Sequence, residues 1–474
     1  MSNVQSYRLH PVTILFNIIR TAREGIFLIV FGLITFDRFY FILLLAVFVL
    51  LGLLLSVLSW YRFTYRLEAG ELRMEYGVFV RKQRYISINR IQSIDLTAGV
   101  IHRMFKLVKL QIETAGSGKG AEASLNAVKL TDAMKLRNAL KGSKESHQRK
   151  ELDRQENSIH PSREITPKRL LLAGVTSGSA GIMIAFAAIA FSELEQFIPD
   201  HFYDWTYQWI IELGIVLIIG LAIIILFIFW LLGIAGTMIK YGKFTITKIG
   251  DELFITRGLL EKKQITIPLK RIQAIGIAES VIRQPFGFVT VFVEVAGGSL
   301  DRGEDFSTVL FPIMKKDEIE PFLHEFLPNY SIESVCFEPL PKQALKFYLI
   351  RACLPILLLG GAAIYFFPQF SWLAVIVLFI AFLLGFMRYR DGGFFLEEER
   401  VVIQFRGLSK KTMFLQHKRV QAFEKKRHPL QKREGLATVK LSILGKSGTG
   451  KHYRLKELKE ADADRLGDWY SYRE

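Results

Sequence analysis

Two kinds of hydrophobic pattern alternate along the chain. Long apolar runs predict six membrane-spanning helices, with cores at residues 25–36, 39–58, 170–191, 213–234, 349–367 and 370–387. Short segments that alternate apolar and polar residues follow each pair of runs, and glycines punctuate them. Alternation with period two predicts antiparallel strands with one buried face. The chain therefore combines three helical hairpins with three β-rich segments.

The first predicted span is the weakest of the six. Its apolar run covers residues 25–36, which is shorter than the roughly 20 residues that a spanning helix needs. We therefore expect one helix that begins near Thr13, with Arg20 and Arg23 extending toward the lipid headgroups. Asp37 and Arg38 then form a tight turn into the second span.

The β-rich part is repeated around one short motif. The motif is Ile-Ser-Ile-Asn-Arg-Ile-Gln-Ser at residues 86–93, Ile-Pro-Leu-Lys-Arg-Ile-Gln-Ala at 267–274 and Leu-Gln-His-Lys-Arg-Val-Gln-Ala at 415–422. In each copy a glycine follows the motif arginine at a distance of 26 positions: Gly116, Gly297 and Gly445. The constant spacing indicates one structural unit per copy. Each copy ends in a helix-like segment, at residues 130–140, 313–326 and 455–469.

We predict an α+β membrane protein in which three transmembrane hairpins alternate with three small β-barrels or sandwiches, each followed by a C-terminal helix. A chain of 474 residues suggests about three domains of roughly 150 residues, which agrees with the three copies. The predicted segments are hairpin 1 (13–59), β-unit 1 (60–142), a linker (143–169), hairpin 2 (170–239) with an outer loop (192–208), β-unit 2 (240–328), a linker (329–346), hairpin 3 (347–387) and β-unit 3 (388–474). His10-Pro11 and His160-Pro161 mark the starts of the first two repeats, and Pro341 marks the third.

Composition and charge give the orientation in the membrane. Hydrophobic residues make up 50% of the chain and the mean hydropathy is +0.26, as expected for a protein partly dissolved in lipid. The net charge is +17, and basic residues flank the spans on one side: Arg62, Arg66, Lys168, Arg169, Lys240, Lys243, Lys342, Lys346, Arg388 and Arg390. The positive-inside rule places this side in the cytoplasm, together with both termini and all three β-units. The outer loop 192–208 carries four acidic residues and no Lys or Arg.

Several classes of chemistry lack a sequence signal. The two cysteines, Cys336 and Cys353, cannot build a disulfide framework or a cysteine-based zinc site, and no histidines have the spacing of metal ligands. The run from Gly445 to Lys451 imitates a phosphate-binding loop, but His452 replaces the Ser or Thr that would hold magnesium, so we interpret the run as a turn. We predict no catalytic residue, no cofactor and no metal. We also predict no nucleic-acid binding, since no basic stripe with stacking aromatics is present.

The repeated pattern resembles the bacterial pleckstrin-homology-like (PH-like) membrane proteins of the YdbT type. The resemblance covers nearly the whole chain and is carried by Gly77/Arg90/Gln92, Gly258/Arg271/Gln273 and Gly407/Arg419/Gln421, together with the His-Pro start and the hairpins. It implies PH-like domains built from two nearly orthogonal sheets and a C-terminal helix, a bacterial inner membrane, and a smaller companion protein with one such domain. The third copy departs from the pattern, since Glu434 stands where Phe105 and Phe286 stand.

The Arg-[Ile/Val]-Gln triplet is the sharpest candidate site. Its members are Arg90, Gln92, Arg271, Gln273, Arg419 and Gln421. One interpretation gives the arginines a lipid phosphate or a partner, because a guanidinium donates two hydrogen bonds to such groups. The other gives the triplet a structural role within the barrel. Retention in all three copies favours the structural role, because every copy must fold whereas one binding site is enough.

We expect a non-enzymatic, multi-pass scaffold whose cytoplasmic PH-like domains mediate homo-oligomerisation or bind a membrane partner or anionic phospholipid. The alternative is a transporter or a lipid-handling component with the PH-like domains as regulators. Ionisable residues near the middle of the membrane would favour the alternative. The spans hold few of them: Glu212 and Arg351 both lie near a membrane surface. Gly174, Gly178 and Gly181 give the third span a face suited to close helix packing.

Overall fold

The computed structural model describes residues 6–35, 37–68, 70–114, 122–140, 160–176, 220, 223–296, 307–330, 335–366, 368, 371–445 and 450–471. The chain divides into two compact units. Unit 1 comprises Met1–His160 and Leu260–Thr266, and unit 2 comprises Pro161–Leu259 and Ile267–Glu474. The predicted outer loop and most of the first linker lie outside the described residues.

Unit 1 contains the first β-unit, which has seven antiparallel strands. One sheet has the order β1 (Tyr7–Arg8), β2 (Thr64–Glu68), β3 (Glu71–Tyr76), β4 (Lys82–Ser87). The remaining strands pair in the order β5 (Ile91–Ala98), β6 (Leu107–Thr114), β7 (Ala123–Lys129). Short helices η1 (Ile88–Arg90) and α4 (Val100–Met104) join strands, and α5 (Leu130–Leu140) follows the last strand, as predicted.

The alternating pattern produces the buried face that the sequence predicts. In the first β-unit, Leu72, Leu110 and Leu125 are fully buried, and they belong to one cluster. The glycine after β3 also has a structural reason. Gly77 has φ of +112°, and a Cβ there would lie 2.0 Å from the Val80 carbonyl oxygen, so only glycine fits this turn.

The predicted first span is not one continuous helix. Residues 13–35 form α1 (Thr13–Glu24) and α2 (Ile26–Thr35), which meet at Gly25 beside α3 (Arg38–Arg62). A Cβ on Gly25 would lie 2.5 Å from Cζ of Phe48, so glycine allows α3 to approach at this break. The break follows the polar end of α1 at Arg23 and Glu24, where the apolar run has not yet begun. In the described part of unit 1, only Phe39–Arg62 is long and apolar enough to cross a membrane.

Unit 2 contains the second and third β-units. The second has the strands β8 (Ser162–Glu164), β9 (Thr245–Ile249), β10 (Glu252–Arg257), β11 (Lys262–Pro268), β12 (Ile272–Glu279), β13 (Phe288–Val295) and β14 (Thr308–Lys315), although Leu260–Thr266 is part of unit 1. The third has β15 (Glu338–Pro339), β16 (Gly393–Leu396), β17 (Arg400–Arg406), β18 (Lys410–Gln416), β19 (Val420–Lys426), β20 (Leu436–Leu444) and β21 (Gly450–Lys459). One seven-stranded sheet, β14-β13-β12-β18-β17-β16-β15, joins the two β-units, and β19-β20-β21 form another.

Helices of unit 2 lie between and after these strands. The short ones are η3 (Leu269–Arg271), η4 (Gln284–Phe286), η5 (Lys316–Glu318), η7 (His417–Arg419) and α13 (Pro429–Arg433). Helices α10 (Ile319–Phe326) and α14 (Glu460–Ser471) follow the last strand of their β-units. Both begin later than predicted, because Ile313 continues β14 and Leu455 continues β21.

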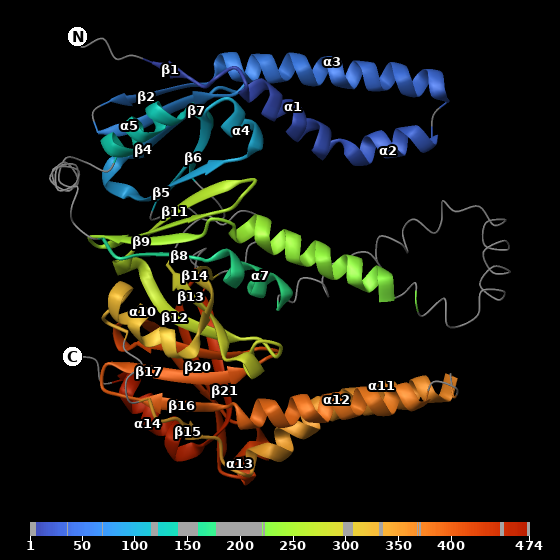
Figure 1. Cartoon of the computed structure of the whole chain (residues 1–474), viewed down its shortest axis with the longest axis vertical. Coiled ribbons are helices and arrows are strands. Elements are labelled where there is room, and N and C mark those ends of the chain that lie inside the picture. The colour runs from blue at the N-terminus through green and yellow to red at the C-terminus, as the bar shows by residue number, and fades with distance from the viewer. Residues whose placement is uncertain are drawn as a thin grey trace. The chain divides into compact units, whose positions relative to one another are not determined.

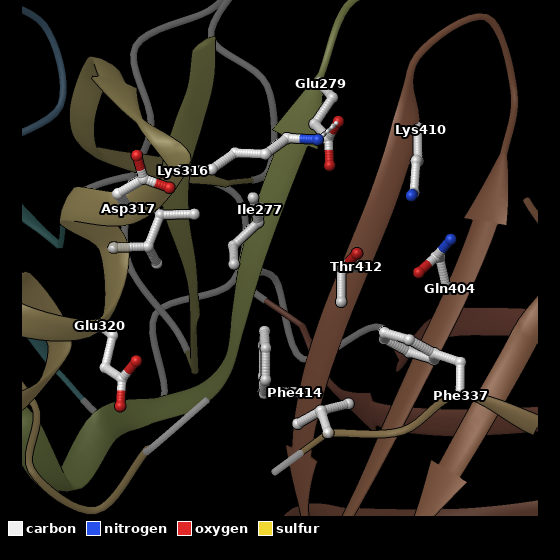
Figure 2. A pocket seen from close by; sticks show the side chains of 12 residues that line it. Ile277, Glu279, Lys316, Asp317, Glu320, Phe337, Gln404, Lys410, Thr412 and Phe414 are labelled. Atoms are coloured by element: carbon white, nitrogen blue, oxygen red, sulfur yellow. Dashed lines mark ion pairs between the residues drawn. The ribbon is translucent and has the colours of Figure 1, made fainter. Parts of the chain in front are cut away.

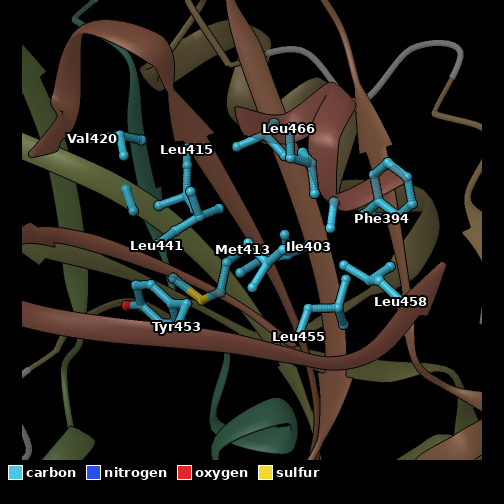
Figure 3. Packing of buried hydrophobic residues seen from close by; sticks show 14 of the residues in the cluster. Phe394, Ile403, Met413, Leu415, Val420, Leu441, Tyr453, Leu455, Leu458 and Leu466 are labelled. Carbon is cyan, nitrogen blue, oxygen red and sulfur yellow. The ribbon is translucent and has the colours of Figure 1, made fainter. Parts of the chain in front are cut away.

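The core of the third β-unit shows how the two sheets pack (Figure 3). Ile403 and Met413 from β17 and β18 lie against Leu441 and Leu455 from β20 and β21. Leu466 of α14 belongs to the same buried cluster. These side chains are at most 3% exposed, and burial of each contributes about 1.5–3 kcal/mol relative to exposure.

Three further helices are long and apolar enough to span a membrane, and all belong to unit 2. They are Ile223–Tyr241, α11 (Ala344–Phe366) and α12 (Ser371–Arg390). Helix α11 packs along α12, and the pair extends from the β-strands in the same direction as Ile223–Tyr241 (Figure 1). Of the predicted third span, only the beginning is described, as α7 (Pro167–Val175). A Cβ on Gly174 would lie 3.0 Å from Cγ2 of Ile234, so this glycine does face a neighbouring helix, whereas Gly178 and Gly181 lie outside the described residues.

The two His-Pro pairs do not occupy equivalent positions. In the first repeat, β1 pairs Arg8 with Thr64, and His10 follows this strand. In the second, β8 pairs Glu164 with Thr245, and His160 precedes the strand. The prediction that both pairs mark the same point of the repeat was therefore wrong. The short first strand, rather than the His-Pro dipeptide, is the feature that the repeats share.

Candidate functional site at the motif turns and the strand junction

The repeated motif forms a corner in each β-unit. The fourth strand ends, one turn of 3₁₀ helix follows, and the fifth strand begins. These turns are η1, η3 and η7, and the motif arginine is the last residue of each. The backbone just before and just after each turn is extended, so the chain changes direction within three residues. The motif therefore carries the chain from one sheet of the β-unit to the other.

Arg271 ties this corner to the far end of the neighbouring strand. Its Nε and Nη2 donate to the Ala296 carbonyl oxygen at 3.0 and 2.7 Å. The Arg271 carbonyl accepts from the Ala296 amide at 3.0 Å and from Nε2 of Gln273 at 3.2 Å. Gln273 is only 4% exposed. In the second β-unit, both predicted site residues thus hold the backbone where β12 leaves the corner.

Arg419 makes a different contact. Its Nη2 donates to the Lys270 carbonyl oxygen at 2.7 Å, so the motif arginine of the third β-unit bonds the motif turn of the second. Tyr330 is buried near Arg419, and burial raises the pKa of Tyr330 to about 12, with the Arg419 charge acting in the opposite direction. Gln421 is exposed.

Arg90 is the exposed member of the three. Its side chain has no hydrogen-bond partner among the residues that the structure describes, and Gln92 is half-buried. The residue equivalent to Ala296 is Ala115, which lies outside the described ranges. Of the six predicted residues, Arg271 and Gln273 thus bond the backbone of their own β-unit, Arg419 bonds the preceding β-unit and Arg90 is exposed. Whether any of them binds lipid or a partner stays a prediction.

The main feature that the sequence did not predict is the pairing of successive β-units edge to edge. Strand β12 pairs antiparallel with β18 from Ala274 opposite Leu415 to Glu279 opposite Lys410. In unit 1, β5 pairs with residues 262–264, from Ala98 opposite Lys262 to Leu96 opposite Gln264. The fifth strand of one β-unit therefore binds the fourth strand of the next. Hydrophobic alternation predicts which face of a strand is buried but not which strands are neighbours, so no sequence signal identified this pairing.

Both junctions have the same register. In each, the residue nine positions before one motif arginine lies opposite the residue eight positions after the preceding motif arginine: Lys262 faces Ala98, and Lys410 faces Glu279. Along each ladder the distance before one arginine stays one position longer than the distance after the preceding arginine, because antiparallel partners move in opposite directions. A strand register is strongly specified where one face is buried. The junction is therefore a repeated, defined interface.

Polar contacts reinforce each junction. Within unit 1, Asp95 Oδ1 accepts from the Thr266 amide, and Nη2 of Arg137 donates to Oγ1 of Thr266, both at 3.1 Å. Within unit 2, Nζ of Lys451 binds Oε1 of Glu294, which is 3% exposed. The buried Tyr453 lies beside this carboxylate, and burial and the negative charge of Glu294 together raise the pKa of Tyr453.

A pocket of about 410 Å³ opens along the β12–β18 junction (Figure 2). On one wall, Nζ of Lys316 lies 2.7 Å from Oε2 of Glu279. On the other, Lys410, Thr412 and Gln404 project from β17 and β18. Charges of both signs line the pocket. The pocket therefore lies along the junction between the second and third β-units.

The third hairpin is tied to its β-unit by ion pairs. Nη2 of Arg351, near the start of α11, lies 2.6 Å from Oε1 of Glu457, which is fully buried in β21. Gln431 donates to the same carboxylate at 3.2 Å. Glu434 lies 2.5 Å from Nζ of Lys346, whereas Phe105 and Phe286 at the equivalent positions are exposed. The departure of the third copy at Glu434 thus accompanies an additional link to α11.

Among the described residues, no group of His, Cys, Asp and Glu is arranged to hold a metal ion. Cys336 is exposed and Cys353 is half-buried. The middle of the glycine-rich run 445–451 lies outside the described residues, as does Glu212.

Comparison with known proteins agrees with the repeat. The model of the bacterial PH domain family matches the chain three times, at residues 25–144, 208–328 and 354–474. The chain is also 37% identical over 485 aligned positions to the UPF0699 transmembrane protein YdbT of Bacillus subtilis (strain 168). The aligned region covers 98% of each of the two chains. The three matched ranges each contain one motif arginine.

Proposed function

Because this chain belongs to the bacterial PH domain family, as a membrane protein of the YdbT type, we propose that it is a non-enzymatic scaffold whose three PH-like domains bind a membrane partner. The observation that carries the proposal is the repeated edge-to-edge junction. The same two strands that build the domain also bind the next domain, in one register, at both junctions. A domain with this property is suited to joining proteins side by side along a membrane.

The full architecture is part of the proposal. Six spans in three hairpins would place every β-unit on one side, which the flanking Lys and Arg assign to the cytoplasm of a bacterial inner membrane. Four apolar helices among the described residues support this arrangement. The eight-segment division of the chain, and a C-terminal helix that caps each β-unit as α14 covers the core with Leu466, belong to the same proposal.

Lipid binding is proposed at Arg90 alone among the three motif arginines. Arg271 uses two of its nitrogen atoms on the Ala296 carbonyl, and Arg419 donates to Lys270, so both guanidinium groups have protein partners. Arg90 is exposed. An exposed guanidinium can bind an anionic phospholipid phosphate through two hydrogen bonds. Such contacts would supplement the hairpins as attachments to the membrane.

The observations give less support to a transporter. Of the two ionisable residues predicted in the spans, Glu212 and Arg351, the structure describes Arg351. Arg351 pairs with Glu457 of the β-unit and not with a second group inside the membrane. A transport path normally uses ionisable residues that face a cavity near the middle of the membrane.

Purification of the tagged full chain from native membranes tests the scaffold. The proposal predicts that at least one other membrane protein co-purifies in a fixed ratio. A chain that is pure and monodisperse under gentle solubilisation, with no companion and no self-association, would refute it. Single cysteines at the exposed positions Lys135, Asp317 and Asp468 test the orientation, with Cys336 and Cys353 replaced by serine. An impermeant maleimide should label them only after the membrane is opened.

A further inference from the structure

Two strand edges are left over by the internal junctions. The junctions use β5 and β12, the fifth strands of the first and second β-units. They also use β11 and β18, the fourth strands of the second and third β-units. The remaining members are β4 in the first β-unit and β19 in the third. Strand β4 pairs with β3, and β19 pairs with β20, and no other described strand pairs with either. Each therefore has one edge of backbone donors and acceptors without a strand partner among the described residues.

The accessibility of β4 agrees with an open edge. Its first four residues, Lys82 to Tyr85, are all exposed, whereas most residues of the equivalent strand β18 are buried. Tyr85 is 52% exposed, although tyrosine is a large and partly apolar side chain. An exposed sheet edge can receive a further strand, because its backbone donors and acceptors are available for main-chain hydrogen bonds.

The sequence of β4 is that of a strand that pairs. The positions nine and eight residues before the motif arginine are basic in all three β-units: Arg81-Lys82, Lys262-Lys263 and Lys410-Lys411. The second and third of these pairs lie within junctions, so the basic start does not prevent pairing. The strands that they face end in Thr97-Ala98 and Ala278-Glu279, which are neutral or acidic.

Strand β19 differs at this end. The positions seven and eight residues after its motif arginine are Lys426 and Arg427, where β5 and β12 have neutral or acidic residues. In the register of the junctions, a second copy of this chain would place Lys426 opposite Lys82 and Arg427 opposite Arg81. Like charges directly opposite each other destabilise a strand pair. Phe423 opposite Tyr85 and Glu424 opposite Arg84 would favour pairing, but Lys426 and Lys440 already bind Glu424.

Charged residues on the last edge of a sheet are a common means of preventing further pairing. We propose that β4 is a docking edge for a PH-like domain of a different polypeptide, whose fifth strand ends in neutral or acidic residues. Lys426 and Arg427 prevent β19 of another copy of this chain from pairing with β4. The proposal rests on the proposed scaffold function and states which edge receives the partner.

A loss-of-binding experiment tests the receiving edge. The tagged full chain carrying Arg81→Glu and Lys82→Glu is purified from native membranes beside the unmodified chain. We expect the companion protein to fall by about tenfold, as for loss of a complementary charged contact. The matched control is Lys135→Glu on α5, an exposed basic residue away from the edge, which should retain the companion. If the edge variant retains the companion in full, the docking proposal is overturned while the scaffold function stands.

A gain-of-binding experiment tests the blocking role of β19. Lys426→Ala with Arg427→Glu gives β19 the same two final residues as Ala278-Glu279 of β12. We expect this full-length variant to form larger species in detergent, measured by light scattering, and Arg81→Glu with Lys82→Glu in the same chain to abolish them. A variant that stays the same size as the unmodified chain would overturn the blocking role. An unmodified chain that self-associates and loses this through the edge variant would assign β4 to a second copy and overturn the heterologous partner.

A peptide with the sequence of residues 91–98 tests the edge without a companion, because this strand pairs with Lys262–Gln264 in the chain itself. A fluorescent form of the peptide should bind the unmodified full chain and bind the Arg81→Glu, Lys82→Glu variant more weakly. Equal binding to both chains would contradict the assignment of β4.

Discussion

Nη2 of Arg419 donates to the carbonyl oxygen of Lys270 across 149 positions of sequence, at 2.7 Å. The arginine of one motif thus binds the turn of the preceding motif, at the end of the β12–β18 ladder. A sequence pattern that repeats three times supports the fold in one copy and the connection between copies in another. The same side chain therefore has different neighbours at its three positions.

This difference predicts unequal effects of removing each arginine. Arg271→Ala removes two charged hydrogen bonds to one carbonyl and should lower the free energy of unfolding by about 1.5–3 kcal/mol. Arg419→Ala, with one such bond at a partly exposed position, should cost about 1 kcal/mol. Arg90→Ala should stay within about 0.5 kcal/mol. Thermal unfolding of the full chain in detergent measures the order, and an equal loss at all three positions would contradict the structure.

Arg90 also has a binding prediction. In nanodiscs that contain anionic lipid, Arg90→Gln should reduce the enrichment of anionic lipid around the chain, because the guanidinium can no longer bind a phosphate. Arg103→Gln, an exposed arginine of α4 in the same β-unit, serves as the control. If both variants have the same lipid profile as the unmodified chain, the lipid role of Arg90 is wrong.

The Arg351–Glu457 pair connects α11 to the third β-unit. Glu457→Gln keeps the shape of the side chain but removes its charge, which leaves the partly exposed Arg351 without its anion. Breaking a fully buried pair costs about 3–5 kcal/mol, and the exposure of Arg351 reduces the expected loss to about 1–3 kcal/mol. Limited proteolysis should cut the variant faster near β21. Glu397→Gln removes an acid that is paired at the surface with Arg400, and it should change little.

The turn between the third and fourth strands is predicted to touch the bilayer. Phe79 at this turn is 88% exposed, and Leu408 at the corresponding turn of the third β-unit is 68% exposed. In unit 2, Nε of Arg388, in the last turn of α12, donates to the Gly407 carbonyl of that turn at 3.2 Å, which places the turn at the end of an apolar helix. A polarity-sensitive label at Phe79→Cys should therefore report an apolar environment in lipid vesicles. The same label at Lys135→Cys should report water, and identical spectra at the two sites would exclude immersion.

Alkaline pH should destabilise the β-units through buried tyrosines. Burial raises the pKa of Tyr65 to about 12, with smaller contributions from Asp132 and Tyr7, and raises that of Tyr330 to about 12. The pKa of each tyrosine is higher in the folded than in the unfolded state. The contribution of these tyrosines to the free energy of unfolding is therefore complete below about pH 10 and is lost as the pH rises toward 12. Between pH 9 and 12, the free energy of unfolding should fall by about 1–2 kcal/mol less in Tyr65→Phe than in the unmodified chain, as measured by chemical unfolding. A variant with the same slope as the unmodified chain would contradict this account.

The sequence predicted the parts of the fold that depend on local pattern. Alternation around Leu72, Leu253 and Val402 identified strands, and the apolar runs identified the four spans that are described. The position of α5 was confirmed, but α10 and α14 begin later because apolar residues such as Ile313 and Leu455 fit a strand as well as a helix. The break at Gly25 depends on Phe48 of another helix, which no local pattern reveals.

The candidate site was predicted in part. The motif arginines were recognised by their repetition, and Arg271 and Gln273 have the structural contacts that one interpretation gave them. The junctions were not predicted, because the pairing of β12 with β18 depends on residues about 140 positions apart in sequence, whose side chains would be equally compatible with other neighbours.

Cysteine cross-linking across β12 and β18 tests the edge-to-edge junction most directly. In the full chain with Cys336→Ser and Cys353→Ser, cysteine pairs are placed at Ile277 with Thr412 and at Ala278 with Lys411, which are opposite each other in the ladder. Neighbouring pairs of an antiparallel ladder alternate between wide and close spacing, with Cα atoms about 5.5 and 4.5 Å apart, so at least one pair should form a disulfide on mild oxidation. The shifted pair Ile277 with Met413 should not, since those side chains lie on opposite faces. Efficient cross-linking of the shifted pair, or none at either matched pair, would contradict the junction on which the scaffold depends.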